Sequence, residues 1–342
     1  MPTLTKTHAD VAGLSFTAMR ALVLHEADEH GLPVLENLDT RVLVGSPYGA
    51  FGVSERSAGV RLHLDARDAA SLFALREAMV AHIEHYLPDV AEKIRWSDAP
   101  AAGGLPPNFQ FARLISSAPL SSNFHRITLK LATQQGYDDA AIHFRFAIPQ
   151  HGIANPQWPT LGENGSIRWP TGDKALHRPV YTVQSQSEDG VATVDIFRHN
   201  GGRTLDWAEH AAPGDDVAMI GPGGGGVPEA ETLLLCGDET AYPAIARILA
   251  CRPDAVSARV LLFTHDGATD YPLPLRTHDE LTWVSAQQGT AFAEAALTHA
   301  RAHTDCFLWF AGEAAQASAV RAALPQLGIS KTTTYVAAFW SA

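Results

Sequence analysis

From residue 231 onward, apolar runs of strand length alternate with helical segments, and this alternation constrains the fold more than any other feature. We expect strands over residues 232–236, 259–264 and 306–311, and helices over residues 242–250, 291–303 and 314–324. Strands that alternate with helices along a chain form a parallel sheet covered by the helices. Residues 228–342 are therefore predicted to form an α/β domain of the nucleotide-binding kind.

The stretch before this domain is rich in strand patterns. Short strand-like runs cover residues 124–131, 142–148, 178–183, 191–198 and 216–220. Strands spaced in this way are typical of a small antiparallel barrel. Residues 158–173 read as a loop, because they are broken by glycine and proline. We therefore predict a β-barrel domain over residues 108–227.

A run of proline, glycine and alanine over residues 99–107 is predicted to be a linker. Before it, helical patterns over residues 15–30 and 66–87 flank strand patterns over residues 41–45, 49–54 and 59–65. Residues 1–98 are therefore predicted to form a small α+β domain that folds independently. The whole chain is expected to be a multidomain α+β protein.

Composition narrows the function classes. The chain has 37 acidic and 25 Lys or Arg residues, a net charge of −12, which argues against nucleic acid as a partner. The start of the chain lacks a signal peptide pattern, and no apolar run is long enough to span a membrane. Cys236, Cys251 and Cys306 show no metal-binding or disulfide spacing. We therefore expect a cytoplasmic protein without membrane insertion.

The barrel carries a candidate flavin motif in Arg178, Tyr181 and Thr182. A flavin needs a cation at its pyrophosphate, an aromatic ring at its isoalloxazine, and a small donor near its reactive nitrogen. Side chains alternate along a strand, so Arg178 and Thr182 share one face and Tyr181 lies on the other. A twist or bulge is then needed for all three to reach one ligand. The alternative is an ordinary strand with an exposed arginine.

A second segment, HNGGRTLDWA over residues 199–208, is a candidate phosphate loop. A glycine turn that enters a helix aims backbone N–H groups and the positive helix end at an anion. Its candidate cofactor-binding residues are His199, Gly202, Arg203, Thr204, Leu205 and Trp207. The alternative is a hairpin or loop followed by a surface helix.

A third segment, LLLCGDETAYP over residues 233–243, reads as strand, turn and helix. Dinucleotides bind at such turns, but Glu239 stands where a second glycine is usual. Carboxylates of Asp238 and Glu239 would repel a pyrophosphate, which predicts a weak nicotinamide site or a protein donor such as a ferredoxin. Alternatively, Asp238 or Thr240 caps the helix. Near the end of the chain, Trp340 is either a core strand residue or a ring that stacks on a cofactor.

Together these segments resemble the siderophore-interacting protein family. The matching motifs are R-P-V-Y-T at 178–182, the glycine loop with W-A at 199–208, P-G-D at 213–215, G-P-G at 221–223, G-D-E-T-A-Y-P-A at 237–244, W-F-A-G-E at 309–313 and F-W at 339–340. The resemblance covers residue 108 to the end. The chain departs from the family at Gln184, where a second arginine is usual, and in the spacing of Arg178. Residues 1–98 resemble a separate small domain of unassigned function.

The resemblance implies a ferredoxin-reductase-like oxidoreductase in which FAD takes electrons from NADPH, NADH or a ferredoxin. It implies reduction of a ferric siderophore or other ferric chelate, with release of Fe(II) and without a metal site in the protein. Tyr181 and Thr182 would lie at the reacting part of the flavin. Asp238, Thr240 and Trp340 would join the cofactor-binding set. An anionic chelate would dock on basic side chains, for which the candidates are Arg198, Lys174, Arg113 and Lys331.

Two other readings stay open. One is a different flavoprotein of the same fold, such as a flavin reductase. The other is a metal- or haem-binding role for the N-terminal domain. Its candidate ligands are His25, His30, His63, His82 and His85. His82 and His85 are three residues apart and share a helix face. The alternative for these histidines is a place on solvent-facing surfaces.

Overall fold

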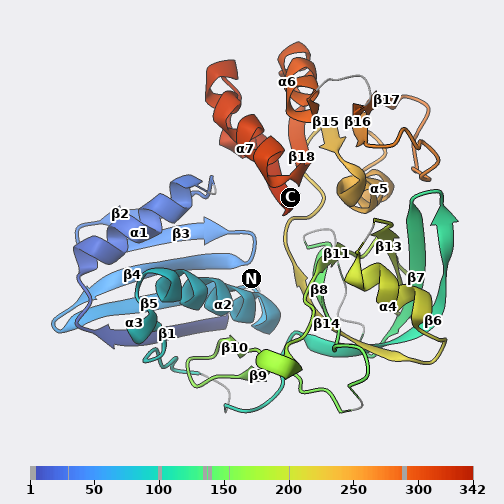
Figure 1. Ribbon diagram of the computed structural model, residues 1–342. Coiled ribbons are helices and arrows are strands. Elements are labelled where there is room, and N and C mark those ends of the chain that lie inside the picture. The colour runs from blue at the N-terminus through green and yellow to red at the C-terminus, as the bar shows by residue number, and fades with distance from the viewer. Residues whose placement is uncertain are drawn as a thin grey trace. The chain divides into compact units, whose positions relative to one another are not determined.

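The computed structural model describes residues 5–29, 31–98, 102–133, 137, 141–153, 155–199, 201–286 and 291–341. The chain divides into two compact units, which are described separately (Figure 1). Unit 1 comprises Met1–Phe109 and Pro149–Leu176, and unit 2 comprises Gln110–Ile148 and His177–Ala342. In the described part of the chain, no helix is long and apolar enough to cross a membrane.

Unit 1 is built on a five-stranded antiparallel sheet with the order β1-β5-β4-β3-β2. Its strands are β1 (Thr5–Ala12), β2 (Val34–Leu38), β3 (Arg41–Ser46), β4 (Gly49–Arg56) and β5 (Gly59–Ala66). Helices α1 (Phe16–Glu29) and α2 (Ala69–Tyr86) pack on one face of this sheet, and the short α3 (Pro88–Ala91) follows α2 (Figure 1). The two helices and β3–β5 agree with the sequence patterns. Strands β1 and β2 were not predicted, because β2 is mostly exposed and lacks a buried face.

Residues 149–176 belong to unit 1, although the sequence pattern placed them in the barrel domain. They contain β9 (Thr160–Leu161), β10 (Ile167–Arg168) and the 3-10 helix η1 (Gly172–Lys174). The indole Nε1 of Trp96 donates to the carbonyl of Asn164 at 3.0 Å, and the Asn164 amide donates to the carbonyl of Ala91 at 3.1 Å. The N–H of Ile167 donates to Glu77 of α2 at 2.6 Å. This segment is thus hydrogen-bonded to α2 and to the residues that follow it.

Unit 2 begins with a seven-stranded sheet of order β11-β8-β14-β6-β7-β13-β12. Its strands are β6 (Phe109–Ser121), β7 (Phe124–Leu131), β8 (His143–Ala147), β11 (Val180–Thr182), β12 (Ser185–Gln186), β13 (Val191–Phe197) and β14 (Asp216–Gly223). The N–H of Val183 donates to Ile142 beside β8, and the next N–H, of Gln184, donates to Thr193 of β13. The chain between β11 and β12 thereby links both edges of the sheet, as a barrel requires. Helix α4 (Arg203–His210) follows β13.

The rest of unit 2 is a five-stranded parallel sheet of order β17-β16-β15-β18-β19. Its strands are β15 (Thr232–Gly237), β16 (Ser257–Thr264), β17 (Glu280–Ser285), β18 (Phe307–Glu313) and β19 (Thr334–Trp340). Its helices are α5 (Tyr242–Cys251), α6 (Phe292–Ala302) and α7 (Ala314–Ala323). Leu233 and Leu235 of β15 pack in the cluster of α5, whereas Leu234 and Cys236 pack with α6 and α7. This two-sided burial explains the continuous apolar run of β15.

The two sheets of unit 2 share aromatic packing. Phe124 of β7 stacks on Tyr242 of α5, with ring centroids 5.7 Å apart, and contacts Tyr271 at 4.4 Å. The Tyr271 hydroxyl donates to Asp195 of β13 at 2.7 Å, and Asp195 also forms a two-pronged ion pair with Arg126. The barrel and the α/β sheet are therefore joined by one continuous set of buried contacts.

Candidate functional site

The candidate flavin motif lies where β11 meets helix α4. Tyr181 packs against Phe146, with ring centroids 5.6 Å apart, and its hydroxyl is hydrogen-bonded to the Thr204 side chain. Thr204 is buried in the first turn of α4, and its Oγ1 lies 3.0 Å from Nε2 of His177. Burial raises the pKa of the Tyr181 phenol. The predicted strand motif and the predicted phosphate loop are therefore brought together around Thr204.

The start of α4 is built to receive an anion. Gly202 is its N-cap and supplies no side-chain cap, and Gly201 before it has a φ of 77°, which favours glycine. The first N–H groups of a helix have no partner inside the helix, and they carry the positive end of the helix dipole. The predicted turn and short helix are thus present. Trp207 of this helix packs on Phe146 at 5.6 Å.

Three arginines lie on the elements that carry these motifs or next to them in the chain. Arg203 begins α4 and, after burial, is the second cause that lowers the pKa of His177 to about 4. Arg178 follows His177 directly, and its carbonyl accepts a hydrogen bond from Arg145 at 2.8 Å. Burial and the charge of Arg178 lower the pKa of Arg145. A helix start without a side-chain cap that begins with Arg203 fits the pyrophosphate of a dinucleotide such as FAD.

Thr182 is held by a histidine that the sequence analysis did not single out. Thr182 is 5% exposed, and its Oγ1 lies 3.1 Å from Nδ1 of His143. The ring of Phe339 packs on His143 edge to face at 5.4 Å, and a Cβ on Gly224 would lie 2.7 Å from the imidazole. Burial lowers the pKa of His143 to about 4. The imidazole is therefore neutral at pH 7 and fixed beside the Thr182 hydroxyl.

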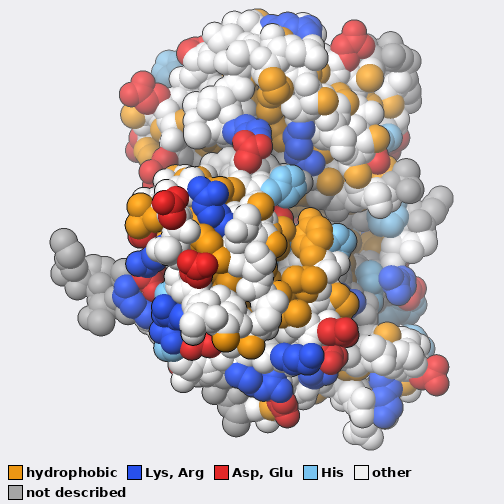
Figure 2. All heavy atoms as spheres, turned by 90° about the vertical axis from the view of Figure 1, so that its left-hand side faces the viewer, with side chains coloured by type: hydrophobic (Ala, Val, Ile, Leu, Met, Phe, Trp, Pro, Cys, Tyr) orange, Lys and Arg blue, Asp and Glu red, His pale blue; other side chains and the backbone are white. Residues whose placement is uncertain are grey.

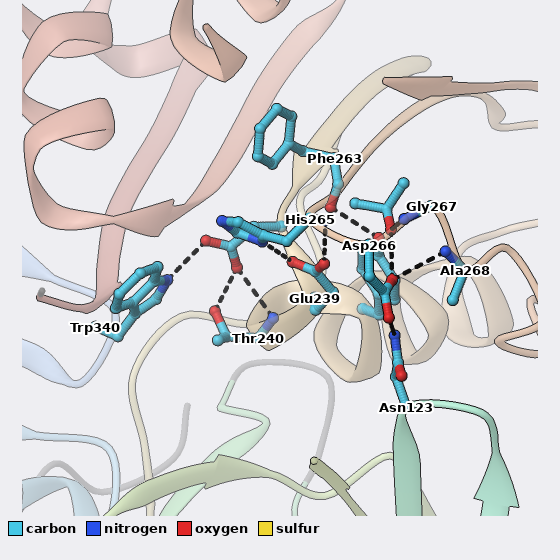
Figure 3. Close-up of polar contacts among 12 residues, drawn as sticks. Asn123, Glu239, Thr240, Phe263, His265, Asp266, Gly267, Ala268 and Trp340 are labelled. Carbon is cyan, nitrogen blue, oxygen red and sulfur yellow. Dashed lines mark hydrogen bonds and ion pairs between the residues drawn. The ribbon is translucent and has the colours of Figure 1, made fainter. Parts of the chain in front are cut away.

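At the carboxyl end of β15, Asp238 caps the turn that leads into α5. Its carboxylate accepts from the N–H of Thr240 at 3.0 Å and from the indole Nε1 of Trp340 at 2.8 Å (Figure 3). A Cβ on Gly312 of β18 would lie 2.8 Å from the same carboxylate. Two residues expected at the cofactor, Asp238 and Trp340, therefore bond to each other.

The Glu239 side chain points into the protein interior. Its side chain is 2% exposed, and its carboxylate accepts from the backbone N–H of His265 at 2.6 Å and from Nδ1 of the same residue at 2.7 Å (Figure 3). The sequence analysis expected Asp238 and Glu239 to face a pyrophosphate. In the structure, both carboxylates accept hydrogen bonds from protein groups, because the loop after β16 and the end of β19 reach this turn.

The candidate docking residues for an anionic chelate lie on separate elements. Arg198 forms an ion pair with Glu209 at 3.0 Å. Arg113 pairs with Asp216 at 3.2 Å. Lys174 is part of η1 in unit 1, whereas Lys331 lies in the 3-10 helix η5 (Lys331–Thr333) of unit 2. The sequence pattern did not single out His143, Arg145 and His177 as candidate site residues, and the signal for two of them was alternation with Phe144 and Phe146 along β8.

Three of the N-terminal histidines have separate partners. His82 bonds to Glu26 at 2.9 Å, His85 packs on Tyr86, and His63 bonds to Ser54 on the sheet. His30 lies outside the described residues. Among the residues that the structure describes, no group of three or more His, Cys, Asp or Glu could hold a metal ion.

A curved antiparallel sheet with an anion-suited helix start, followed by a parallel α/β sheet, defines a ferredoxin-reductase-like fold. Solved structures agree. The siderophore utilization protein from T. fusca superposes with a TM-score of 0.54 at 23% identity, over 70% of this chain and 95% of that one. The siderophore-interacting protein from Acinetobacter baumannii gives 0.56 at 21% identity, over 68% and 90%. The cytochrome P450 reductase GcoB from Amycolatopsis gives 0.50 at 18% identity, over 68% and 70%.

Comparison of the sequence with known protein families identifies the family within this fold. Residues 113–226 match the siderophore-interacting FAD-binding domain, and residues 230–342 match the siderophore-interacting protein family. The NADPH-dependent ferric-chelate reductase of Escherichia coli K12 is 32% identical over 208 residues, which cover 57% of this chain and 78% of that protein. The chain belongs to the siderophore-interacting protein family.

Another relative is much longer than the matched region. The mycobactin import ATP-binding/permease protein IrtA of Mycolicibacterium smegmatis is 31% identical over 181 residues. That match covers 50% of this chain but only 21% of the importer.

Proposed function

We propose that this chain binds FAD and reduces a ferric siderophore or related ferric chelate, with NADPH as the electron donor. The observation that carries the proposal is the helix start at Gly202, without a side-chain cap, in a helix that begins with Arg203 and whose Thr204 contacts Tyr181 of β11. The match to the FAD-binding domain and the name of the E. coli relative support it.

Bound FAD would supply the step that nicotinamide does poorly, which is to take a hydride and pass on single electrons. The chelated iron is the substrate. Reduction of Fe(III) to Fe(II) weakens its binding to hard oxygen ligands, because the charge falls and the ion becomes softer. The iron then leaves the chelate.

The residues of this chain would bind and orient. Arg178 and Arg203, with the first N–H groups of α4, would neutralise the pyrophosphate. Tyr181 would pack against the isoalloxazine ring. Thr182 would present its hydroxyl to the flavin, held in one orientation by the neutral His143. Thr240 and Trp340, at the carboxyl ends of the parallel strands, lie where dinucleotides meet such sheets.

A reduced ferredoxin stays our alternative electron donor, and a flavin reductase our alternative enzyme. We also propose a cytoplasmic location, supported by free cysteines at positions 236, 251 and 306 and by the absence of a spanning helix in the described part of the chain. Comparison of soluble and membrane fractions tests the location.

One preparation tests the main proposal. The purified protein should be yellow, hold about one FAD per chain, and lose its flavin absorbance when NADPH is added without oxygen. Addition of a ferric chelate should restore the absorbance and release Fe(II), measured with a colorimetric Fe(II) chelator. Colourless protein that takes up no FAD would refute the proposal, whereas faster reduction of free flavin than of any ferric chelate would favour the alternative enzyme.

Arg178→Ala should weaken FAD binding. Charge-assisted hydrogen bonds contribute roughly 1.5–3 kcal/mol, which corresponds to about a ten- to a hundredfold loss of affinity. The measurement is fluorescence titration of the flavin-free protein. Arg113→Ala removes the same charge from an arginine paired with Asp216 on β14 and should leave the affinity unchanged. Equal affinities for the two variants would exclude Arg178 from the site.

A further inference from the structure

The sheet of unit 1 carries a hollow on the face opposite its helices. Along β5, Val60, Leu62 and Leu64 are buried in the core with α1 and α2, so the residues between them face the other way. The hollow has a volume of about 230 Å³. The side chains that line it and are used below are Lys6, His8, Arg41, Arg61, His63 and Asp65.

Basic groups dominate this lining. It holds three cations and one carboxylate, in a chain whose net charge is −12. Lys6 bonds to Asp65 at 2.7 Å, and Arg61 uses Nε and Nη2 on Asp10 at 2.7 and 2.6 Å. Arg41 differs, because its Nε is buried without a hydrogen-bond partner. Figure 2 shows basic side chains gathered beside acidic ones at the left edge of the face that it presents.

The Arg41 guanidinium therefore has one donor, its Nε–H, that makes no hydrogen bond in the structure. The Glu36 carboxylate is 3.7 Å from Nε, beyond hydrogen-bond distance. A buried donor without a partner is unfavourable, and a bound acceptor would relieve it. Guanidinium groups favour carboxylate and phosphate, whose oxygens match their planar fork.

The floor of the hollow is polar, uncharged and open. His63 bonds to Ser54 at 2.7 Å, and burial together with Arg41, Arg61 and Arg56 lowers its pKa to about 4, whereas Asp65 acts the other way. Across the sheet, His63 lies opposite His8 on one side and opposite Gly52 on the other. The charges of Arg41 and Arg61 beside His63 would repel a divalent cation.

We propose that this hollow binds an oxyanion, as the carboxylate or phosphate group of a small ligand. Arg41 is the principal contact, and Lys6 and Arg61 supply further positive charge. The neutral His63, held by its hydrogen bond to Ser54, offers a polar group to the same ligand. The site lies in unit 1 and does not depend on flavin binding.

The test titrates the full chain with inorganic phosphate and, separately, with citrate, while NMR follows the histidine ring signals. We expect saturable binding of one anion per chain. A bound anion offsets the charge of the arginines, so it should raise the pKa of His63 above about 4. Tighter binding of citrate assigns the site to carboxylates, and tighter binding of phosphate assigns it to phosphates.

Arg41→Gln should weaken binding about tenfold or more, because it removes the charge-assisted contact. The matched control is Arg20→Gln, which removes a charge from α1, where Arg20 bonds to Asn37. If Arg41→Gln fails to fold, Lys6→Gln takes its place. Absence of saturable binding of either anion, or equal binding by the variant and its control, would overturn the proposal.

Discussion

Burial keeps three histidines of this chain uncharged near neutral pH. The pKa values of His63, His143 and His177 are each lowered to about 4, with loss of hydration as the largest cause. An unfolded chain binds protons on these rings from about pH 6.5 downward. The stability that they contribute is therefore complete above pH 6.5 and is lost as the pH falls towards 4.

We expect His143→Gln to reduce this dependence on pH. His143 is 6% exposed, and its shift corresponds to roughly 3 kcal/mol between pH 6.5 and 4. Gln does not titrate, and it keeps a polar atom for Thr182. The measurement is urea unfolding at a series of pH values. His210→Gln is the control, because His210 is exposed. Parallel pH profiles for wild type and His143→Gln would contradict the assignment.

Glu239→Gly should destabilise the fold rather than open a nucleotide site. The buried carboxylate accepts two hydrogen bonds from His265, and both are lost when the side chain is removed. The expected loss is about 1–3 kcal/mol of unfolding free energy. Stopped-flow reduction by NADPH supplies the second readout. A stable variant with faster reduction would restore the idea that this carboxylate opposes phosphate.

His143 shows what the sequence could not reveal at this scale. The R-x-x-Y-T motif was visible because its residues are contiguous. The partner of Thr182 lies 39 residues earlier, on a strand whose pattern HFRFA offers no signal for a functional histidine. The register of β8 with β11, which places His143 opposite Thr182, is a property of the folded sheet.

At the scale of elements, helix α2 is hydrogen-bonded to the segment of residues 149–176 through Glu77, where burial disfavours the charged form of the carboxyl group. Burial raises the pKa of Glu77 to about 7, with Glu84 adding to the effect and the hydrogen bond from Ile167 opposing it. A raised pKa means that the folded state holds its proton more tightly than the unfolded chain. The contribution of Glu77 is complete below about pH 4.5 and is lost as the pH rises through 7.

Glu77→Gln should therefore stabilise the protein above pH 7. The amide oxygen can still accept from Ile167, and the charge that burial disfavours is gone. The increase in unfolding free energy over wild type should be larger at pH 8 than at pH 4.5, by on the order of 2 kcal/mol. Thermal unfolding at both pH values measures it, with the exposed Glu55→Gln on β4 as the control. A gain that is the same at both pH values would show that Glu77 does not titrate as stated.

Elements whose apolar residues recur at a clear helical or strand period were predictable from the sequence. Elements that depend on contacts with distant segments were not. Helix α2 and strand β5 followed from their spacing. Strand β17 was missed, because its burial is incomplete and its apolar residues are few. Residues 158–173 were read as a barrel loop, because the hydrogen bonds that attach this segment to Glu77, Ala91 and Trp96 span 68 to 90 positions in the chain.

For the whole molecule, the boundary between residues 98 and 108 is not a clean place to cut. A chain that begins at Leu105 keeps residues 149–176 but lacks Glu77, Ala91 and Trp96, to which that segment is hydrogen-bonded. We expect this truncated chain to be cleaved within 149–176 by limited proteolysis, at protease concentrations that leave the full chain intact. Mass spectrometry of the fragments locates the cut.

Removal of the segment as well should restore resistance. Ile148 and His177 exchange two backbone hydrogen bonds, at 2.9 and 2.8 Å, so the ends of the segment already lie side by side. A chain from Leu105 with 149–176 replaced by a short Asn-Gly turn should resist the protease and still bind FAD under the proposed function. Persistent aggregation of this shortened chain would show that unit 2 needs unit 1 to fold.

The pairing of Ile148 with His177, at the two ends of the inserted segment, also affects how such a protein can gain or lose a domain during evolution. A domain joined only at its end can be gained or lost in a single recombination event. Here the chain passes between the units three times, after residues 109, 148 and 176. Loss of the first hundred codons alone would leave residues 149–176, which are encoded later in the gene, without their hydrogen-bond partners. The two parts must therefore be inherited together, or exchanged only when the later segment is deleted at the same time.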